Sequence, residues 1–146
     1  MAQVTAVCIS EKRGIPKRGV PYIDIKENHG IIGDAHAGDW HRQISLLAEE
    51  SIEAMRGLGL DLPPGAFAEN IITKGMTLAA LPVGSVLRIG DTELTITQIG
   101  KECHSGCAIQ QTTGKCVMPT EGVFAIVKKG GRITPGDTVT LLENTK

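Results

Sequence analysis

The stretch that decides the fold lies at residues 86–97 and reads Val86-Leu87-Arg88-Ile89-Gly90-Asp91-Thr92-Glu93-Leu94-Thr95-Ile96-Thr97. Apolar and polar side chains alternate on both sides of the pair Gly90-Asp91. A period of two is typical of half-buried strands, and Gly beside Asp is typical of the turn in a tight hairpin. The sequence therefore predicts a β-hairpin, and it is the clearest strand pair in the chain.

Further strand-like segments lie on both sides of this hairpin. Apolar or alternating runs predict strands at residues 4–9, 22–26, 44–47, 67–73 and 138–141, with a loop at 10–19 and a turn at 28–30. Residues 48–56 alone have helical spacing, because Ala48, Ile52 and Met55 share one face. The chain is thus expected to be mainly β, a barrel of short strands with one or two short helices, in a single domain spanning residues 1–146.

Composition narrows the classes of function. The 146 residues include 15 Lys plus Arg and 16 Asp plus Glu, a formal net charge of −1, and 41% are hydrophobic. This balance disfavours general binding to nucleic acid or to an anionic membrane surface. The apolar runs are far shorter than the roughly 20 residues that span a bilayer, and the first residues do not resemble an export signal. We therefore expect a soluble, cytoplasmic protein whose four cysteines are reduced.

Three of the cysteines gather in one segment that follows the hairpin. Residues 100–109 carry Lys101, Cys103, His104 and Cys107, and Cys116 comes nine residues later. Lys101 and His104 would favour the thiolate form of Cys103, which attacks electrophiles and binds soft metals. Cys103 is therefore the leading candidate nucleophile or metal ligand. The remaining cysteine, Cys8, lies in an apolar run and is expected in the core.

Other interpretations of this segment stay open. Cys103, His104, Cys107 and Cys116 are four possible zinc ligands, although the C-x₃-C spacing is unusual for zinc and no C-x-x-C pair supports a redox dithiol. A zinc-stabilised, non-catalytic interaction module is thus the alternative function. Cys116 is either a second thiol working with Cys103 or a buried residue packed beside its apolar neighbours.

Two loops carry further candidate residues. Residues 33–42 contain Asp34, His36 and His41, which form a metal or acid–base site or hydrogen-bond the backbone, and Arg42, which binds phosphate or carboxylate or braces the loop. In the loop at 10–19, the cations are solvated or hold one phosphate. These cations are Lys12, Arg13, Lys17 and Arg18. The chain has no P-loop, no G-x-G-x-x-G and no G-x-S-x-G, so nucleotide cofactors and serine hydrolysis have no support.

Several short motifs follow one another along nearly the whole chain. They are Ser10-x-x-x-Gly14-x-x-Lys17, Gly30-Ile31-x-Gly33-Asp34-Ala35-His36-Ala37-Gly38, His41-Arg42-Gln43-x-Ser45-Leu46-Leu47, Phe67-Ala68-Glu69-Asn70-Ile71, Ile89-Gly90-Asp91-x-x-Leu94 with Gly100-Lys101-Glu102-Cys103-His104, and Gly131-x-Ile133-x-Pro135-Gly136-Asp137. Each is weak by itself, whereas their order and spacing together are specific. In this pattern the chain resembles the MOSC domain, the module named for the C-terminal part of molybdenum cofactor sulfurases.

This resemblance implies a fold and a function. The fold is a strongly curved, mainly β barrel. The function is handling of the molybdenum cofactor (molybdopterin), either as a sulfur carrier with a Cys103 persulfide or as a binder that matures or delivers the cofactor. Cys103 falls where related amidoxime-reducing proteins have the cysteine that ligates molybdenum. By the same analogy, residues of the matching segments bind the cofactor and its phosphate, namely Lys12, Arg13, Lys17, His36, Arg42 and Asn70.

The resemblance also implies partners. They are the biosynthetic and acceptor proteins of the molybdenum cofactor and a cysteine desulfurase. In sulfurases a separate pyridoxal-phosphate domain makes the persulfide, and no lysine in this chain is expected to hold pyridoxal phosphate.

Overall fold

The computed structural model describes residues 2–11, 17–35, 37–56, 69–76, 78–99 and 122–143. Within these ranges the elements are β1 (Ala2–Ile9), β2 (Arg18–Val20), β3 (Ile23–Lys26), β4 (Gly30–Ile31), β5 (Ile44–Ala48), α1 (Glu49–Arg56), β6 (Ile71–Lys74), the 3-10 helix η1 (Leu78–Ala80), β7 (Val86–Ile89), β8 (Thr92–Ile99), β9 (Val123–Lys129), β10 (Gly131–Ile133) and β11 (Thr138–Glu143).

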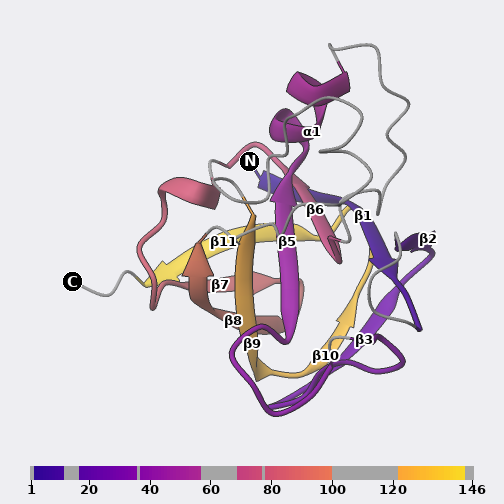
Figure 1. Cartoon of the computed structure of the whole chain (residues 1–146). Coiled ribbons are helices and arrows are strands. Elements are labelled where there is room, and N and C mark those ends of the chain that lie inside the picture. Colours follow the sequence, from indigo (N-terminus) through magenta and orange to yellow (C-terminus); the bar gives the residue numbers. More distant parts are fainter. Residues whose placement is uncertain are drawn as a thin grey trace, which may run out of the picture.

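Seven of the described strands close into a barrel. Their order is β11-β7-β8-β9-β5-β6-β1, and a further pairing between β11 and β1 completes the ring (Figure 1). Closure removes the open strand edges that a flat sheet would present. β2 extends the sheet by pairing with the far end of β1, and a second sheet in the order β10-β3-β4 lies beside the barrel. This arrangement confirms the predicted mainly β barrel.

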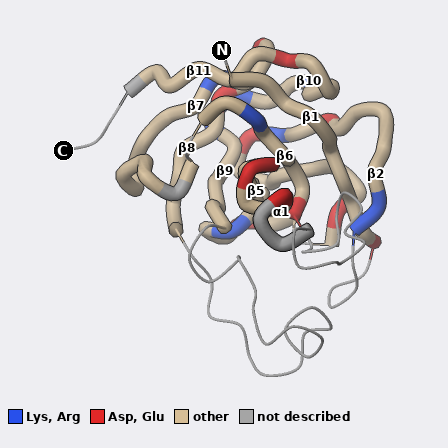
Figure 2. Tube along the Cα trace, turned by 90° about the horizontal axis from the view of Figure 1, so that it is seen from above, with Lys and Arg blue, Asp and Glu red and all other residues tan. Residues whose placement is uncertain are grey.

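Helix α1 connects neighbouring strands that run in the same direction. β5 and β6 are parallel, with Leu46 opposite Ile71 and Ala48 opposite Thr73, whereas the other strand pairs are antiparallel. Parallel neighbours need a crossover connection, and α1 begins this crossover directly after β5. The helix contacts both strands (Figure 2).

The predicted hairpin forms β7 and β8. Val86 pairs with Thr95 and Ile89 with Thr92, so the turn falls at Gly90 and Asp91 as the sequence predicts. Gly90 has a φ of +58°, and a Cβ at this position would lie 2.9 Å from the Oδ2 atom of Asp137. Only glycine therefore satisfies both the backbone conformation and the close approach of the neighbouring turn.

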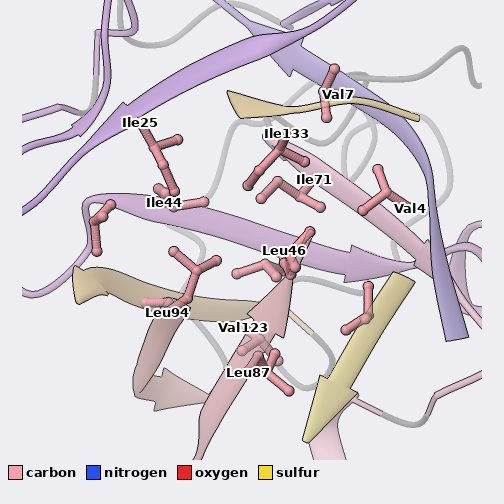
Figure 3. Close-up of a cluster of buried hydrophobic side chains, with 14 of the residues drawn as sticks. Val4, Val7, Ile25, Ile44, Leu46, Ile71, Leu87, Leu94, Val123 and Ile133 are labelled. Carbon is pink, nitrogen blue, oxygen red and sulfur yellow. The ribbon is translucent and has the colours of Figure 1, made fainter. Parts of the chain in front are cut away.

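The core fills the barrel and the space beneath the smaller sheet. Side chains such as Ile44, Leu46, Ile71, Leu87 and Leu94 are fully buried and point toward one another from different strands (Figure 3). The smaller sheet adds Ile25, Ile31 and Ile133 to the same cluster. Burial of each such side chain contributes about 1.5–3 kcal/mol, and this is the main force that holds the two sheets together.

The structure corrects some of the predicted boundaries. The loop predicted at residues 10–19 ends earlier, because β2 begins at Arg18 and pairs with the end of β1. The predicted turn moves to residues 27–29, and Gly30 starts β4 because it pairs with Lys26. β9 and β10 were not predicted as strands. Within the described ranges, no helix combines the length and apolar character that crossing a membrane requires.

Candidate functional site

A buried ion pair joins the loop that precedes β2 to the loop that follows β4. The Nζ atom of Lys17 lies 2.8 Å from the Oδ1 atom of Asp34, and both side chains are completely inaccessible to solvent. The same Oδ1 atom accepts a hydrogen bond of 3.0 Å from the backbone N–H of Ser10, and the N–H of Ala35 donates to the carbonyl of Ser10. Asp34 therefore ties the end of β1 to two loops that carry predicted site residues.

A second buried group lies where β1, β5 and β6 meet. Asn70 directly precedes β6 and is completely buried. Its Oδ1 atom accepts hydrogen bonds from the N–H and hydroxyl of Ser45, at 3.0 and 3.2 Å, and its Nδ2 atom donates to the carbonyl of Cys8 at 3.1 Å. Because core residues flank Ser45 and Cys8 along their strands, the side chains of both point away from the barrel interior, and Asn70 bonds to both residues there.

The Cys8 thiol belongs to this outer layer. Its side chain is inaccessible to solvent. The pKa of Cys8 is raised to about 12, mainly by burial and in part by the nearby Glu69 carboxylate, while Lys17 acts in the opposite direction. The expected burial of Cys8 is thus confirmed, and the thiol is protonated at neutral pH. Cys8 is therefore a buried packing residue of this outer layer.

The Arg42 guanidinium lies near two aromatic rings on the same side of the barrel. Its Cζ atom is 4.7 Å from the centroid of the Trp40 ring and 5.7 Å from that of Phe124. Phe124 alternates with core residues of β9, so it points outward, yet it is only 5% exposed. Within the described part of the chain, the buried Nε atom of Arg42 has no hydrogen-bond partner. A stacked guanidinium with an unpaired donor is suited to an oxyanion.

The loop that carries Trp40 and Arg42 is fastened to β8. The hydroxyl of Thr97 donates to the carbonyl of His41, and the Nε2 atom of His41 lies 2.9 Å from the Oε1 atom of Gln98. β8 ends at Ile99, which pairs with Val123 of β9. The sequence between these two strands carries the predicted cysteine segment.

The predicted site residues therefore fall into two groups. Lys17, Arg42 and Asn70 lie within the described ranges. Lys17 pairs with Asp34 and Asn70 holds strands together, while Arg42 has an unpaired donor. The others lie outside the described residues, namely Lys12, Arg13, His36, Lys101, Cys103, His104 and Cys116. The alternative zinc ligands fall there too, and the part that is described contains no group of three or more potential metal ligands.

Sequence reasoning missed Ser45 and Phe124 as members of this face. Both are outward-facing positions on buried strands, where a polar or aromatic residue interrupts an otherwise aliphatic run. That interruption is the signal that could have drawn attention to them. The described charged residues spread along the whole trace, with neither sign gathered in one region (Figure 2). The site is thus local rather than part of a broad electrostatic surface.

Comparison with known proteins places this geometry in a family. A family model described as "MOSC domain" matches residues 33–140, which include Asp34, Arg42 and Asn70. The chain belongs to the MOSC domain family. This family is associated with the molybdenum cofactor. A search of curated proteins found no match.

Solved structures share the MOSC fold with this chain. The YUAD protein from Bacillus subtilis superimposes with a TM-score of 0.78 at 20% identity, covering 95% of this chain and 94% of that one. YiiM from Geobacillus stearothermophilus gives a TM-score of 0.72 at 18% identity, covering 98% of this chain and 76% of that one. YiiM from Escherichia coli gives 0.65 at 18% identity, covering 98% and 71%. At these identities the likeness concerns the fold.

Proposed function

We propose that this MOSC domain binds the molybdenum cofactor through its phosphate, for maturation or delivery of the cofactor. The observation that carries the proposal is Arg42, whose guanidinium is stacked on Trp40 and Phe124 and whose buried Nε atom has no partner in the described ranges. A planar guanidinium matches a phosphate with two parallel N–H groups. Because contacts with two rings restrain the guanidinium, little side-chain entropy is lost when the anion binds.

The residues present fit the cofactor in their donor chemistry. Arg42 would hold the phosphate together with Lys12, Arg13 and His36, which come from the loops adjoining Lys17 and Asp34 in the sequence. Cys103 would supply a soft thiolate, and soft sulfur suits molybdenum. The bound cofactor would supply the metal and its redox chemistry. This chain's own residues would bind it, orient it and exclude water.

Lys17 and Asn70 would act through other residues. The ammonium of Lys17 is neutralised by Asp34, and both polar groups of the Asn70 side chain are engaged by β1 and β5. We therefore assign them positioning roles. Lys17 would fix the loop that carries Lys12 and Arg13, and Asn70, which directly precedes β6, would keep β1, β5 and β6 aligned.

Sulfur carriage by Cys103 belongs to the same proposal. Lys101 and His104 would favour its thiolate, and Cys116 would be a second thiol that accepts the sulfur or closes a disulfide. Incubation with a cysteine desulfurase and free cysteine, followed by mass spectrometry, would reveal one added sulfur atom on Cys103. Absence of that adduct, with retained cofactor binding, would restrict Cys103 to a ligand role.

Cofactor binding is tested by metal and pterin content. The chain is purified from a molybdenum-replete host, and molybdenum is measured by mass spectrometry beside pterin fluorescence. Replacement of Arg42 by glutamine should weaken binding by about 10- to 100-fold, since hydrogen bonds to a charged group contribute about 1.5–3 kcal/mol. Arg88→Gln is the matched control, because Arg88 is an exposed arginine on β7.

The expected pattern separates the two parts of the site. Arg42→Gln and Cys103→Ser should both lose cofactor, while Arg88→Gln retains it. Equal cofactor content in wild type and Arg42→Gln would show that the stacked guanidinium is not the phosphate site. Retention by Cys103→Ser would remove the thiolate ligand from the proposal.

A further inference from the structure

A cavity lies beside β2, at the point where the chain turns from β2 into β3. Its volume is about 300 Å³, and it opens between the end of the eight-stranded sheet and the smaller sheet. The lining is mostly apolar, with charged side chains at two places. The lining residues are Ile9, Arg18, Val20, Pro21, Tyr22, Ile23, Asp24 and Ile32. Its volume is at the lower end of the range that binds small ligands or single large side chains.

The rim of the cavity is exposed and carries an ion pair beside an aromatic ring. The guanidinium of Arg132 donates to both carboxylate oxygens of Asp24, at 2.8 and 3.3 Å, and its Cζ atom lies 3.9 Å from the centroid of the Tyr22 ring. Tyr22 is 44% exposed and Ile32 is 58% exposed. Tyrosine and arginine are enriched at protein interfaces, and an aromatic ring that is already fixed loses little entropy on binding.

The free edge of β2 lies next to this cavity. β2 is the last strand in the order of its sheet, and it pairs with β1 through Val7 with Val20, Cys8 with Gly19 and Ile9 with Arg18. The N–H of Cys8 donates to the Asn70 carbonyl and the Cys8 carbonyl accepts from the Asn70 side chain, so both groups of Cys8 point away from β2.

The orientation of Cys8 fixes the orientation of its partner. Alternate residues of a strand direct their backbone groups to opposite edges, so Val7 and Ile9 bond β2 and the Cys8–Gly19 pair does not. The N–H and C=O of Gly19 therefore face the free edge. A Cβ built on Gly19 would point out of the sheet, to the face opposite Arg18 and Val20, and would meet nothing within 4 Å. Within the described residues, β2 pairs with β1 alone, so its other edge is unpaired.

We propose that β2 and the adjoining cavity bind an extended segment of a partner protein, added antiparallel to β2. One residue of this segment would exchange two backbone hydrogen bonds with Gly19. Its two neighbours would then point to the face that carries Arg18 and Val20, which is the face of the cavity. In the partner segment, the residue before the one paired with Gly19 lies opposite Val20, and the residue after it lies opposite Arg18.

The chemistry of these two positions defines the partner. An apolar side chain opposite Val20 would enter the cavity beside Tyr22 and Ile32. An acidic side chain opposite Arg18 would meet an exposed guanidinium whose contact with Glu11 is long, at 3.8 Å, and solvated. The recognised pattern is therefore apolar-x-acidic. Pro21 has no N–H, so pairing beyond Gly19 is limited and the segment is short. The inference does not rest on the proposed cofactor site.

The probe is an end-capped, dye-labelled peptide of nine residues, threonine throughout except for leucine at the fifth position and glutamate at the seventh. Binding to the full chain is measured by fluorescence anisotropy. Two control peptides carry lysine in place of the glutamate or an N-methyl group on the residue between leucine and glutamate. Arg18→Glu, Ile32→Ser and Val83→Ser are the protein variants. Val83 is an exposed apolar residue outside the cavity lining, so it is the matched control for Ile32.

The proposal predicts that reversing the charge at residue 18 reverses the preference between the glutamate peptide and the lysine peptide. Arg18→Glu should weaken binding of the glutamate peptide by about five- to tenfold and should restore binding of the lysine peptide, as expected for an exposed ion pair whose sign is reversed. Ile32→Ser should weaken binding by about threefold, and the N-methyl peptide should bind at least about tenfold more weakly. Val83→Ser should leave the affinity unchanged, and all variants should keep the melting temperature within the error of wild type.

Other outcomes overturn the proposal. One is that the glutamate peptide fails to bind wild type at millimolar concentration. Another is that Arg18→Glu leaves its affinity unchanged. If phenylacetate binds in an Arg18-dependent way while the peptide does not, the cavity is a small-molecule site. Equal binding of the N-methyl peptide would exclude strand addition at Gly19.

Discussion

Replacement of Lys17 by methionine tests whether the buried ion pair with Asp34 holds the two loops together. The substitution keeps the apolar stem and removes the ammonium, which leaves the inaccessible Asp34 carboxylate without its countercharge. The Ser10 N–H still donates to the carboxylate at 3.0 Å, but it carries no full charge. Breaking a buried pair from one side costs about 3–5 kcal/mol, and we expect about 3 kcal/mol here.

The expected loss is measured by urea unfolding followed through Trp40, the only tryptophan in the chain. In thermal unfolding, Lys17→Met should lower the melting temperature by about 10 °C in a domain of this size. Asp34→Asn alone should cost a similar amount. The double variant should cost about 2 kcal/mol less than the sum of the two, because the second substitution removes a charge whose partner in the ion pair is already gone.

An exposed ion pair is the control. Arg18→Met removes the solvated contact with Glu11 at 3.8 Å and should change stability by less than about 0.5 kcal/mol. If Lys17→Met also costs less than about 1 kcal/mol, or if the two substitutions at the buried pair add without coupling, the pair does not hold the loops together.

Further predictions concern three single residues of the same molecule. Asn70→Ala removes the hydrogen bonds that the buried Asn70 side chain makes with β1 and β5, so it should cost about 2–4 kcal/mol in urea unfolding. A loss below about 1 kcal/mol would show that this side chain does not hold the strands together. Gly30→Ala combines a φ of +113° with a Cβ only 2.9 Å from the carbonyl oxygen of Gln43, so its melting temperature should fall further than that of Gly33→Ala, where the φ is +91° but nothing lies within 4 Å. If the two variants lose the same melting temperature, the backbone near Gly30 shifts and relieves the contact between the new Cβ and the Gln43 carbonyl. Burial raises the pKa of Cys8 to about 12, so iodoacetamide at about pH 8 should spare it in the folded chain and modify it in urea, as read by peptide mass spectrometry. Since an unfolded thiol titrates near 9.0 and the folded one near 12, stability should decline as pH rises through that interval. Rapid native labelling of Cys8 would refute its burial.

The sequence predicts those strands whose own residues show an alternating or apolar pattern. The hairpin of β7 and β8 has alternating arms and a Gly-Asp turn, and β1, β3 and β5 have clear apolar runs. The strands that escape prediction are mostly short. β2, β4 and β10 have two or three residues each, which is too few to display a period. Their pairing depends on edges that other strands provide, such as the end of β1 beside Arg18.

In the candidate site, too, some features follow from a local pattern and others depend on distant residues. Sequence motifs singled out Arg42, Lys17 and Asn70, but their individual roles depend on residues far away in the chain. Lys17 meets Asp34, 17 positions further on, and Asn70 reaches Cys8, 62 positions earlier. Neither contact has a local pattern, because it arises only when the barrel closes. The alternatives left open for these residues in the sequence could therefore be distinguished only by the folded geometry.

The pairing of β1 with β11 has a consequence for synthesis of the chain on the ribosome. Ala2 lies opposite Val139, so the first strand to emerge must wait for the last before the ring can close. A nascent chain that stops short of Thr138 would leave open edges on both β1 and β7, since β11 covers both. Open edges of this kind pair readily with other chains. The partly translated protein is therefore the state in which aggregation is most to be expected and in which chaperone binding would matter most.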